Sequence, residues 1–321
     1  MSRCEGFDFV EDSFGRKIDY ARVSLTDRCN LRCVYCMPET GVDKKECGEI
    51  LRYEQIDEII KALVALGIKK IRFTGGEPLV RAGAADFITQ CIKKYNDIGF
   101  YITTNASFLG GYAKQFKEAG LKGVNISLDS LSLGNYKSIT RGGDLYKALE
   151  GLHKAMECGL PKIKVNSVLI KGTPEGQLLE IANLTLNYPI DVRFIELMPI
   201  GSCAAFAREN YMKPDILFDI MPGLKPVSPE DASSPAAYFK LPGAKGKIGL
   251  INPISCKFCH SCNRIRVTAD GKIKHCLHSD EEFDLLNGGI REIILKAASL
   301  KPEGHNMEDR SITRDMKRIG G

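Results

Sequence analysis

Cysteines with the spacing of metal ligands occur twice in this 321-residue chain, which has 12 cysteines in all. The first cysteine set, Cys29, Cys33 and Cys36, forms a CxxxCxxC run. Three thiolates on one short loop can hold three irons of a 4Fe–4S cluster, and the fourth iron then stays open to a ligand from outside the protein. A structural zinc site is the alternative, but it requires four ligands and no His precedes His153. The spacing therefore favours iron–sulfur chemistry at this set.

The second cysteine set, Cys259, Cys262 and Cys276, has the pattern CxxCx₁₃C, and Cys256 extends it to CxxCxxC. Spacing alone leaves a zinc site and an iron–sulfur cluster equally open here. Three histidines lie nearby in the sequence: His260, His275 and His278. The other five cysteines have no metal ligand at short spacing, and we expect them to be structural or incidental: Cys4, Cys47, Cys91, Cys158 and Cys203.

The composition is that of an ordinary globular protein, with 44% hydrophobic and 26% charged residues, which excludes a disordered or collagenous chain. The net charge of +5 is too small to indicate a nucleic-acid partner. No stretch approaches the roughly 18 consecutive apolar residues of a membrane helix, and the N-terminus lacks the apolar core of a signal peptide. We therefore expect a cytoplasmic protein with neither nucleic acid nor a membrane as partner, and reduced thiols rather than disulfides.

Strand and helix periods alternate over the first two-thirds of the chain. Strands are expected at 18–25, 69–73, 100–103, 124–128, 163–170 and 192–197. Helices are expected at 53–66, 84–95, 112–119, 145–158 and 175–186. This alternation predicts an α/β fold, an incomplete (β/α)6 TIM-like barrel, whose chemistry lies at the C-terminal ends of the strands. Unusual residues do follow these strands: Cys29, Gly75, Gly76, Thr104, Asn105, Asp129 and Met198.

The alternation stops near Pro199, and we place a domain boundary there. Residues 1–199 form the barrel domain, and residues 200–321 form a smaller C-terminal cluster-binding extension that ends in two glycines. Within the extension, 201–247 shows no period and is rich in Pro, Ser, Gly and Ala. Short strands at 248–251, 265–268 and 272–274 and a helix at 282–300 are expected after it.

The first cysteine set resembles the cluster motif of radical S-adenosylmethionine (SAM) enzymes, because Tyr35 is the aromatic residue expected before the last Cys. The segment from Phe73 to Pro78, FTGGEP, resembles the SAM-binding segment of that superfamily. The resemblance implies that the open iron chelates the amino and carboxylate groups of SAM, whose reductive cleavage yields a 5′-deoxyadenosyl radical. It further implies four SAM-contacting positions: Tyr35, Gly76, Ser127 and Met198.

The stretch 253–277, PISCKFCHSCNRIRVTADGKIKHCL, is similar to the C-terminal cluster segment of the GTP 3′,8-cyclase (MoaA) family of molybdenum cofactor biosynthesis. The similarity runs from about residue 17 to the terminal Gly320 and Gly321, which in that family reach back into the active site. It implies a second 4Fe–4S cluster on Cys259, Cys262 and Cys276, whose open iron contacts guanine. Two departures stand out: the extra thiol of Cys256, and Ala106 where the family often has Gly.

This resemblance implies a lyase that converts GTP to 3′,8-cyclo-7,8-dihydro-GTP. Arg suits a triphosphate because its planar fork binds phosphate oxygens bidentately. Residues that match GTP-binding positions of the family are Arg22, Lys70, Arg72, Thr103, Lys164, Arg193, Arg264 and Arg266. The implied catalytic residues are Arg264, Arg266, Gly320 and Gly321.

The implied partners are a reductant such as a flavodoxin or ferredoxin, the downstream cyclic pyranopterin monophosphate synthase, and a second copy of the chain in a homodimer. Three alternatives remain at this point. The chain could be another radical SAM enzyme with an auxiliary cluster, acting on a peptide. It could instead be a zinc-dependent nucleic-acid-binding module, whose binding would be salt-sensitive, or a simple electron carrier.

Overall fold

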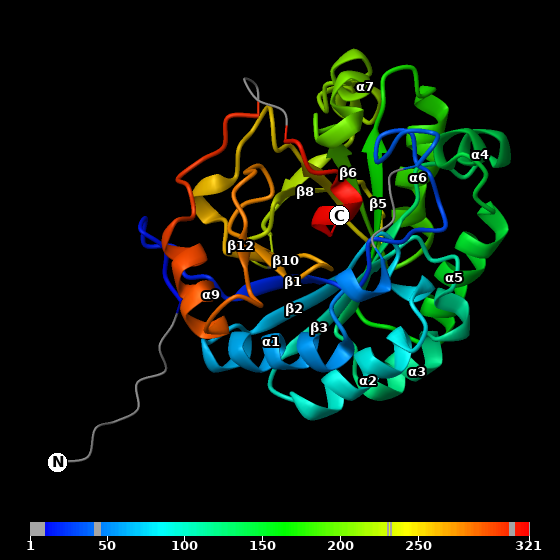
Figure 1. Ribbon diagram of the computed structural model, residues 1–321. Helices are drawn as coiled ribbons and strands as arrows, with labels where there is room; N and C mark the ends of the chain where they lie inside the picture. The colour runs from blue at the N-terminus through cyan, green and yellow to red at the C-terminus, as the bar shows by residue number, and fades with distance from the viewer. Residues whose placement is uncertain (1–9, 42–45, 230, 232, 308–311, 321) are drawn as a thin grey trace.

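The computed structural model describes the chain except for residues 1–9, 42–45, 230, 232, 308–311 and 321. Within the described residues, the strands form one twelve-stranded sheet in the order β12-β11-β10-β1-β2-β3-β4-β5-β6-β9-β8-β7. Its centre is parallel and consists of β1 (Tyr20–Ser24), β2 (Lys70–Thr74), β3 (Gly99–Thr104), β4 (Gly123–Ser127), β5 (Ile163–Leu169) and β6 (Asp191–Glu196). The sheet curves without closing, which confirms the predicted incomplete barrel (Figure 1).

Helices cover the convex side of this curved sheet (Figure 1). They are α1 (Tyr53–Ala65), α2 (Ala84–Lys94), α3 (Ala113–Ala119), α5 (Leu145–Glu157) and α6 (Glu175–Asn187). Helix α4 (Leu133–Thr140) instead packs against the loop after β1, because its carbonyls accept from Arg32 N and Val34 N. The five helices of the convex side match the predicted helices within a few residues, whereas α4 was not predicted. The reason is that α4 buries only Tyr136 and Thr140, so it has no apolar stripe for periodicity to detect.

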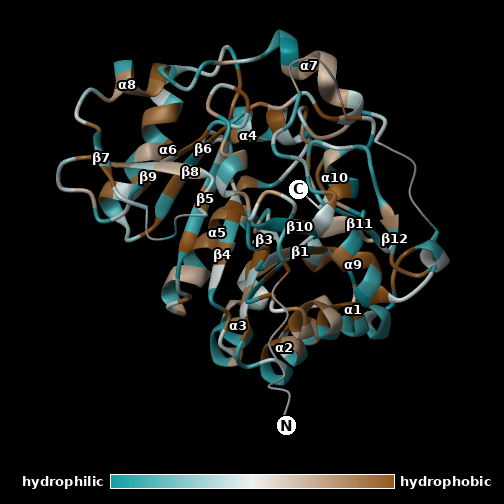
Figure 2. Cartoon of the chain, turned by 90° about the vertical axis from the view of Figure 1, so that its left-hand side faces the viewer, coloured by the Kyte–Doolittle hydropathy of each residue, from teal (hydrophilic) through white to brown (hydrophobic). Residues whose placement is uncertain are grey.

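Successive side chains of each strand point alternately to the hydrophobic core and to the concave side of the sheet. In β5, Ile163, Val165 and Leu169 are buried toward the helices, whereas Lys164 and Asn166 line the concave side. Successive strand residues point to opposite faces, so one strand serves both purposes. Helices α1 and α9 carry both apolar and polar residues, as expected for helices with one side against the core (Figure 2).

The C-terminal extension joins the barrel sheet at both edges. Its strands are β7 (Lys225–Val227), β8 (Ala236–Lys240), β9 (Ile248–Ile251), β10 (Arg264–Val267), β11 (Lys272–Lys274) and β12 (Phe283–Asp284). Strand β9 pairs in parallel with β6, and β10 pairs in parallel with β1. The remaining pairs, β7–β8, β8–β9, β10–β11 and β11–β12, are antiparallel. The second cysteine set is thereby brought beside β1, which leads into the first.

The predicted helix over 282–300 is wrong over 282–289. Phe283–Asp284 instead forms β12, and the helix α9 (Ile290–Ser299) begins after Gly288, whose φ is 147°. Apolar residues at Leu285 and Leu286 extended the helical pattern in the sequence, but they belong to the turn. Three short helices were also not predicted: α7 (Ala204–Glu209), α8 (Ile216–Ile220) and α10 (Met316–Ile319). No helix among the described residues is long and apolar enough to cross a membrane.

Candidate functional site

A cavity of about 460 Å³ lies on the concave side of the sheet. This volume is in the range of small-molecule sites. Inward side chains of β1 to β6 form its wall, and segments that follow β1 and β9 and the C-terminal tail cover it. Both cysteine sets line it, so the topology brings together two motifs that are more than 200 residues apart in sequence.

The first cysteine set lies in the loop after β1, and its three thiols are half-buried. The backbone N–H of Leu31 donates to Cys29 Sγ at 3.4 Å. Burial raises the pKa of Cys33, and the neighbouring Asp129, Cys36 and Cys29 raise it further, which shows that the thiols interact. Metal binding would convert these thiols to thiolates, and amide donors to sulfur suit an iron–sulfur cluster.

The glycines of the FTGGEP segment allow it to press against the loop of the first cysteine set. A Cβ on Gly75 would lie 2.6 Å from Thr26 O, and one on Gly76 would lie 2.4 Å from Arg28 O. The same two carbonyls accept hydrogen bonds from Gly76 N and Glu77 N, both at 2.8 Å. Any side chain at these positions would separate the two loops, so the glycines fix the cysteine loop as well as exposing backbone to the cavity.

The four predicted SAM positions, Tyr35, Gly76, Ser127 and Met198, all line the cavity. Tyr35 is held in place by its phenol, which donates to Asp129 Oδ2 at 2.6 Å. The other carboxylate oxygen of Asp129 accepts the Val168 N–H at 2.8 Å, and burial raises the pKa of Asp129 to about 6. Asp129 thus orients the aromatic residue of the cysteine motif.

Glu77 is a buried carboxyl that we did not predict as a site residue, although it is part of FTGGEP. It accepts hydrogen bonds from Thr104 Oγ1 at 2.7 Å and from Asn105 N at 2.6 Å. Burial raises its pKa to about 7. Ala106, which follows Asn105, has a φ of +64°, and this left-handed conformation explains why Gly is common at that position in the family.

The structure brings the second cysteine set together on the cavity wall, whereas Cys256 is exposed and outside it. The backbone N–H of His278 donates to Cys276 Sγ at 3.4 Å, and Arg264 Nη1 lies 4.0 Å from Cys262 Sγ. Among the described residues, no three His, Cys, Asp or Glu side chains are arranged around a single metal ion. A 4Fe–4S cluster takes each thiolate on a different iron, so its ligands line a wall rather than meet at one atom.

All eight predicted GTP residues line the cavity. Strand register places Arg22 beside both Arg72 of β2 and Arg266 of β10, so three guanidinium groups form one row. Burial lowers the pKa of Arg22, and the charge of Arg266 lowers it further. For Arg266, burial lowers the pKa to about 10. A buried row of cations is costly without an anion, which makes this wall suited to a polyphosphate.

A second row lies nearer the N-terminal ends of the strands, where Tyr20 pairs in register with Lys70 and Arg264. The Tyr20 phenolic oxygen accepts a hydrogen bond from Arg72 Nε at 2.7 Å. Burial raises the pKa of Tyr20, but the charges of Arg72, Arg22 and Lys70 outweigh this and lower it to about 7. Lys70 also lies 3.7 Å from the carboxylate of Asp231.

The opposite wall carries the remaining predicted residues. Lys164 Nζ lies 3.1 Å from Asp191 Oδ2 and 2.8 Å from the Tyr238 hydroxyl. Arg193 Nε donates to Asn166 Oδ1 at 2.9 Å. Within the described part of the chain, the buried hydroxyl of Thr103 has no hydrogen-bond partner, so it is available to a ligand.

Six further residues line the cavity but were not predicted from the sequence: Tyr20, Asn125, Asn166, Tyr238, Lys301 and Lys317. The alternation of side chains along β4 and β5 could have revealed the two asparagines.

The C-terminal tail enters the site. Gly320 has φ of +83°, and a Cβ there would lie 2.6 Å from Thr74 Oγ1. Arg266 Nη1 donates to its carbonyl oxygen at 3.1 Å. The tail also reaches the first cysteine set, since Lys317 N donates to Cys36 Sγ. The last predicted catalytic residue, Gly321, lies outside the described residues.

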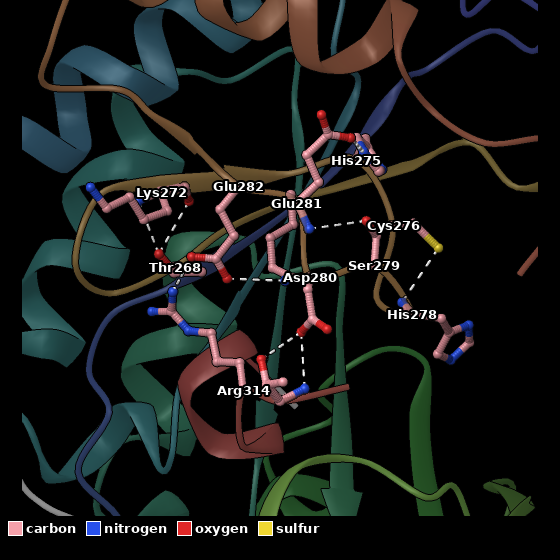
Figure 3. Close-up of polar contacts among 12 residues, drawn as sticks. Thr268, Lys272, His275, Cys276, His278, Ser279, Asp280, Glu281, Glu282 and Arg314 are labelled. Atoms are coloured by element: carbon pink, nitrogen blue, oxygen red, sulfur yellow. Dashed lines mark hydrogen bonds and ion pairs between the residues drawn. The ribbon is translucent and has the colours of Figure 1, made fainter. Parts of the chain in front are cut away.

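The loop that follows Cys276 anchors this tail (Figure 3). Asp280 Oδ1 accepts hydrogen bonds from Thr313 N at 2.9 Å and Thr313 Oγ1 at 2.8 Å. Arg314 forms ion pairs with Glu282 and Asp270. The position of the tail is therefore tied to the segment that carries a ligand of the second cysteine set.

Comparisons with known proteins agree with this geometry. Residues 23–185 match the Radical SAM superfamily, and residues 190–307 match Molybdenum Cofactor Synthesis C. A GTP 3′,8-cyclase from Peptoclostridium acidaminophilum is 49% identical over 317 residues, which cover 97% of this chain and 98% of that protein. One from Alkaliphilus oremlandii is 47% identical over 322 residues, which cover 97% and 100%.

Among solved structures, Streptococcus suis SuiB bound to S-adenosylmethionine has a TM-score of 0.62 at 12% identity, over 87% of this chain and 66% of that one. This likeness concerns the fold alone. Together, the unclosed parallel barrel and its CxxxCxxC loop define a radical SAM enzyme. The chain belongs to the GTP 3′,8-cyclase family of that superfamily. Its cofactors are SAM and two 4Fe–4S clusters, as predicted.

Proposed function

We infer that this protein converts GTP to 3′,8-cyclo-7,8-dihydro-GTP, the first step of molybdenum cofactor biosynthesis. The observation that carries the inference is that both cysteine sets and a row of three arginines face one cavity. A substrate held there would lie between the residues that would hold the first cluster with SAM and those that would hold the second cluster. An electron carrier would need neither the arginine row nor the FTGGEP segment.

Separate residues of the chain would bind the first cluster and SAM. The first cysteine set would hold the first cluster, and Tyr35, Gly76, Ser127 and Met198 would bind SAM beside it. When bound, the first cluster and SAM supply the radical chemistry that removes hydrogen from the ribose. The protein contributes orientation and a pocket that excludes water, both of which matter for a reactive radical.

On the substrate side, Arg22, Arg72 and Arg193 would bind phosphate oxygens, and their fixed strand positions leave little freedom to lose on binding. The Thr103 hydroxyl, Lys70 and Lys164 add further donors around the same cavity. The second cysteine set, Cys259, Cys262 and Cys276, would hold the cluster that contacts guanine. Arg264 and Arg266 follow Cys262 on β10, and Arg266 belongs to the arginine row, so this strand would place the second cluster beside the phosphate-binding residues.

We further propose catalytic roles for Arg264, Arg266, Gly320 and Gly321, because Arg264 and Arg266 line the cavity and Arg266 Nη1 donates to the carbonyl oxygen of Gly320. The remaining partners follow from the proposed reaction. These are a flavodoxin or ferredoxin as reductant, cyclic pyranopterin monophosphate synthase as the next enzyme, and a homodimer as the assembly. A cytoplasmic location, the absence of nucleic-acid partners and a domain division after residue 199 complete the proposal.

Metal analysis of anaerobically purified and reconstituted protein tests this proposal. Iron, sulfide and zinc are measured for the wild-type protein and for a Cys259→Ala, Cys262→Ala, Cys276→Ala triple variant. The expected result is iron for two clusters in the wild type, half of it in the variant, and formation of the cyclised product from GTP by the wild type only. Iron for one cluster together with one zinc in the wild-type protein would contradict the proposal and point to another radical SAM reaction.

A further inference from the structure

We propose that Lys301 is a positioning residue of the second cysteine set: its ammonium group joins the two chain segments that carry Cys262 and Cys276 and places a positive charge beside the cluster they bind. This inference rests on the proposed function, because it requires a cluster at that set. Lys301 comes just after α9 and lies outside every motif discussed above.

The hydrogen bonds of Lys301 show the joining role. Its side chain is buried, with 2% of the residue exposed, and lines the cavity. The ammonium Nζ donates to Arg264 O at 2.8 Å and to His275 O at 2.7 Å. Arg264 is two residues after Cys262, and His275 directly precedes Cys276. One ammonium group therefore fixes the spacing between two ligands that are distant along the chain.

The positive charge of Lys301 also fits a cluster at this site. Both carbonyls that accept from it are neutral, and a buried ammonium is expensive unless a negative charge stands nearby. Cys262 lies two residues before Arg264, whose carbonyl accepts from this ammonium, and both Cys262 and Lys301 line the cavity, so a cluster held there would supply the negative charge. The buried ammonium is thus best satisfied when the second cysteine set holds its cluster, because the ligating thiols are then thiolates.

A cation at this point has a measurable consequence. The reduction potential of an iron–sulfur cluster depends on the local net charge and on hydrogen bonds to its sulfurs. A positive charge stabilises the reduced, more negative cluster. Lys301 therefore raises the potential of the second cluster, while the first cluster, on the other side of the cavity, is affected less.

The test compares Lys301→Met with Lys301→Arg. Methionine fills a similar volume without charge or donors, whereas arginine keeps both. Lys296→Met is the matched control, because Lys296 is exposed on α9 five residues earlier. Each reconstituted protein is analysed for iron and sulfide, and the potentials of both clusters are determined by redox titration followed by electron paramagnetic resonance.

The expected result for Lys301→Met is a lower potential of the second cluster, with the first cluster and the control unchanged. Loss of iron from the second set alone, recovered in Lys301→Arg, also supports the proposal. An unchanged potential in a fully loaded Lys301→Met protein would overturn it. So would equal loss of both clusters in both Lys301 variants, which indicates a general folding role. Wild-type protein that holds zinc at the second set would instead overturn the proposed function, which separates the two failures.

Discussion

The guanidinium group of Arg266 donates a hydrogen bond to the carbonyl oxygen of Gly320 across 3.1 Å. Arg266 lies on β10, four residues after Cys262, and also stands in the arginine row beside Arg22. A single side chain therefore links the segment of the second cysteine set, the arginine row and the C-terminal tail. This hydrogen bond ties the chain end to the wall of the cavity, as the proposed role of the terminal glycines requires.

A methyl group at Gly320 should disable the enzyme. In Gly320→Ala the new Cβ would lie 2.6 Å from Thr74 Oγ1, and a left-handed φ costs an L-residue about 1–2 kcal/mol. We expect the tail to leave its place and the rate of GTP cyclisation to fall by roughly 10-fold or more, since 1.4 kcal/mol is about a factor of 10. Anaerobic initial rates measure this. The control Gly304→Ala meets open space and should be as active as wild type; full activity of Gly320→Ala would contradict the structural argument.

Removal of one charge from the arginine row should weaken substrate binding. A charge-assisted hydrogen bond contributes about 1.5–3 kcal/mol, so Arg22→Met should raise KM for GTP by roughly 10- to 100-fold. The exposed Lys114, on α3, provides a control in Lys114→Met with the same change in net charge. Isothermal titration with GTP on the cluster-loaded protein gives the affinity directly. Equal affinities of the two variants would show that Arg22 does not contact the phosphates.

Periodicity was sufficient to predict the barrel, and spacing was sufficient to find the two cysteine sets, because both features depend on local sequence. The strand pattern at 163–170, for example, places Lys164 and Asn166 on one face wherever the strand lies. Resemblance then supplied the eight GTP positions, and each of them lines the cavity. What local sequence could predict was therefore which face of each strand carries chemistry.

The pairing of strands that lie far apart in the sequence could not be predicted from local sequence. Nothing in the segment around Arg264 indicates that β10 pairs with β1, or that β9 pairs with β6 at the other edge. Lys301 was missed for the same reason, since a single lysine after a helix has no pattern of its own and acquires its role only through two distant carbonyls. Helix α4 was missed because its buried side is too small to give a period.

Glu77 should make the stability of the cluster-free protein depend on pH. Burial raises its pKa to about 7, so the folded state keeps a proton that the unfolded state loses near the ordinary value of about 4.5. The contribution of this group to the free energy of unfolding is therefore lost as pH rises from about 4.5 to about 7, by roughly 3 kcal/mol.

In Glu77→Gln this part of the pH dependence should disappear. Chemical denaturation between pH 4.5 and 7.5 tests it, with Glu118→Gln, an exposed carboxyl on α3, as control. The difference between the variant and wild type should change steadily with pH over this window. A constant difference would mean that Glu77 titrates normally in the folded protein.

Arg314 should hold the tail in place from a distance. Its guanidinium pairs with Glu282 and Asp270, so Arg314→Met leaves the segment 312–320 with fewer contacts to the loop after Cys276 (Figure 3). Charged hydrogen bonds of this kind contribute about 1.5–3 kcal/mol, and we expect roughly a 10-fold faster hydrogen exchange of α10 amides together with slower GTP cyclisation. Arg208→Met, an exposed residue of α7, is the control. Because Arg314 lies away from the cavity, iron content and SAM binding should stay at wild-type values; unchanged exchange of α10 would show that Asp280 and Thr313 alone suffice to anchor the tail.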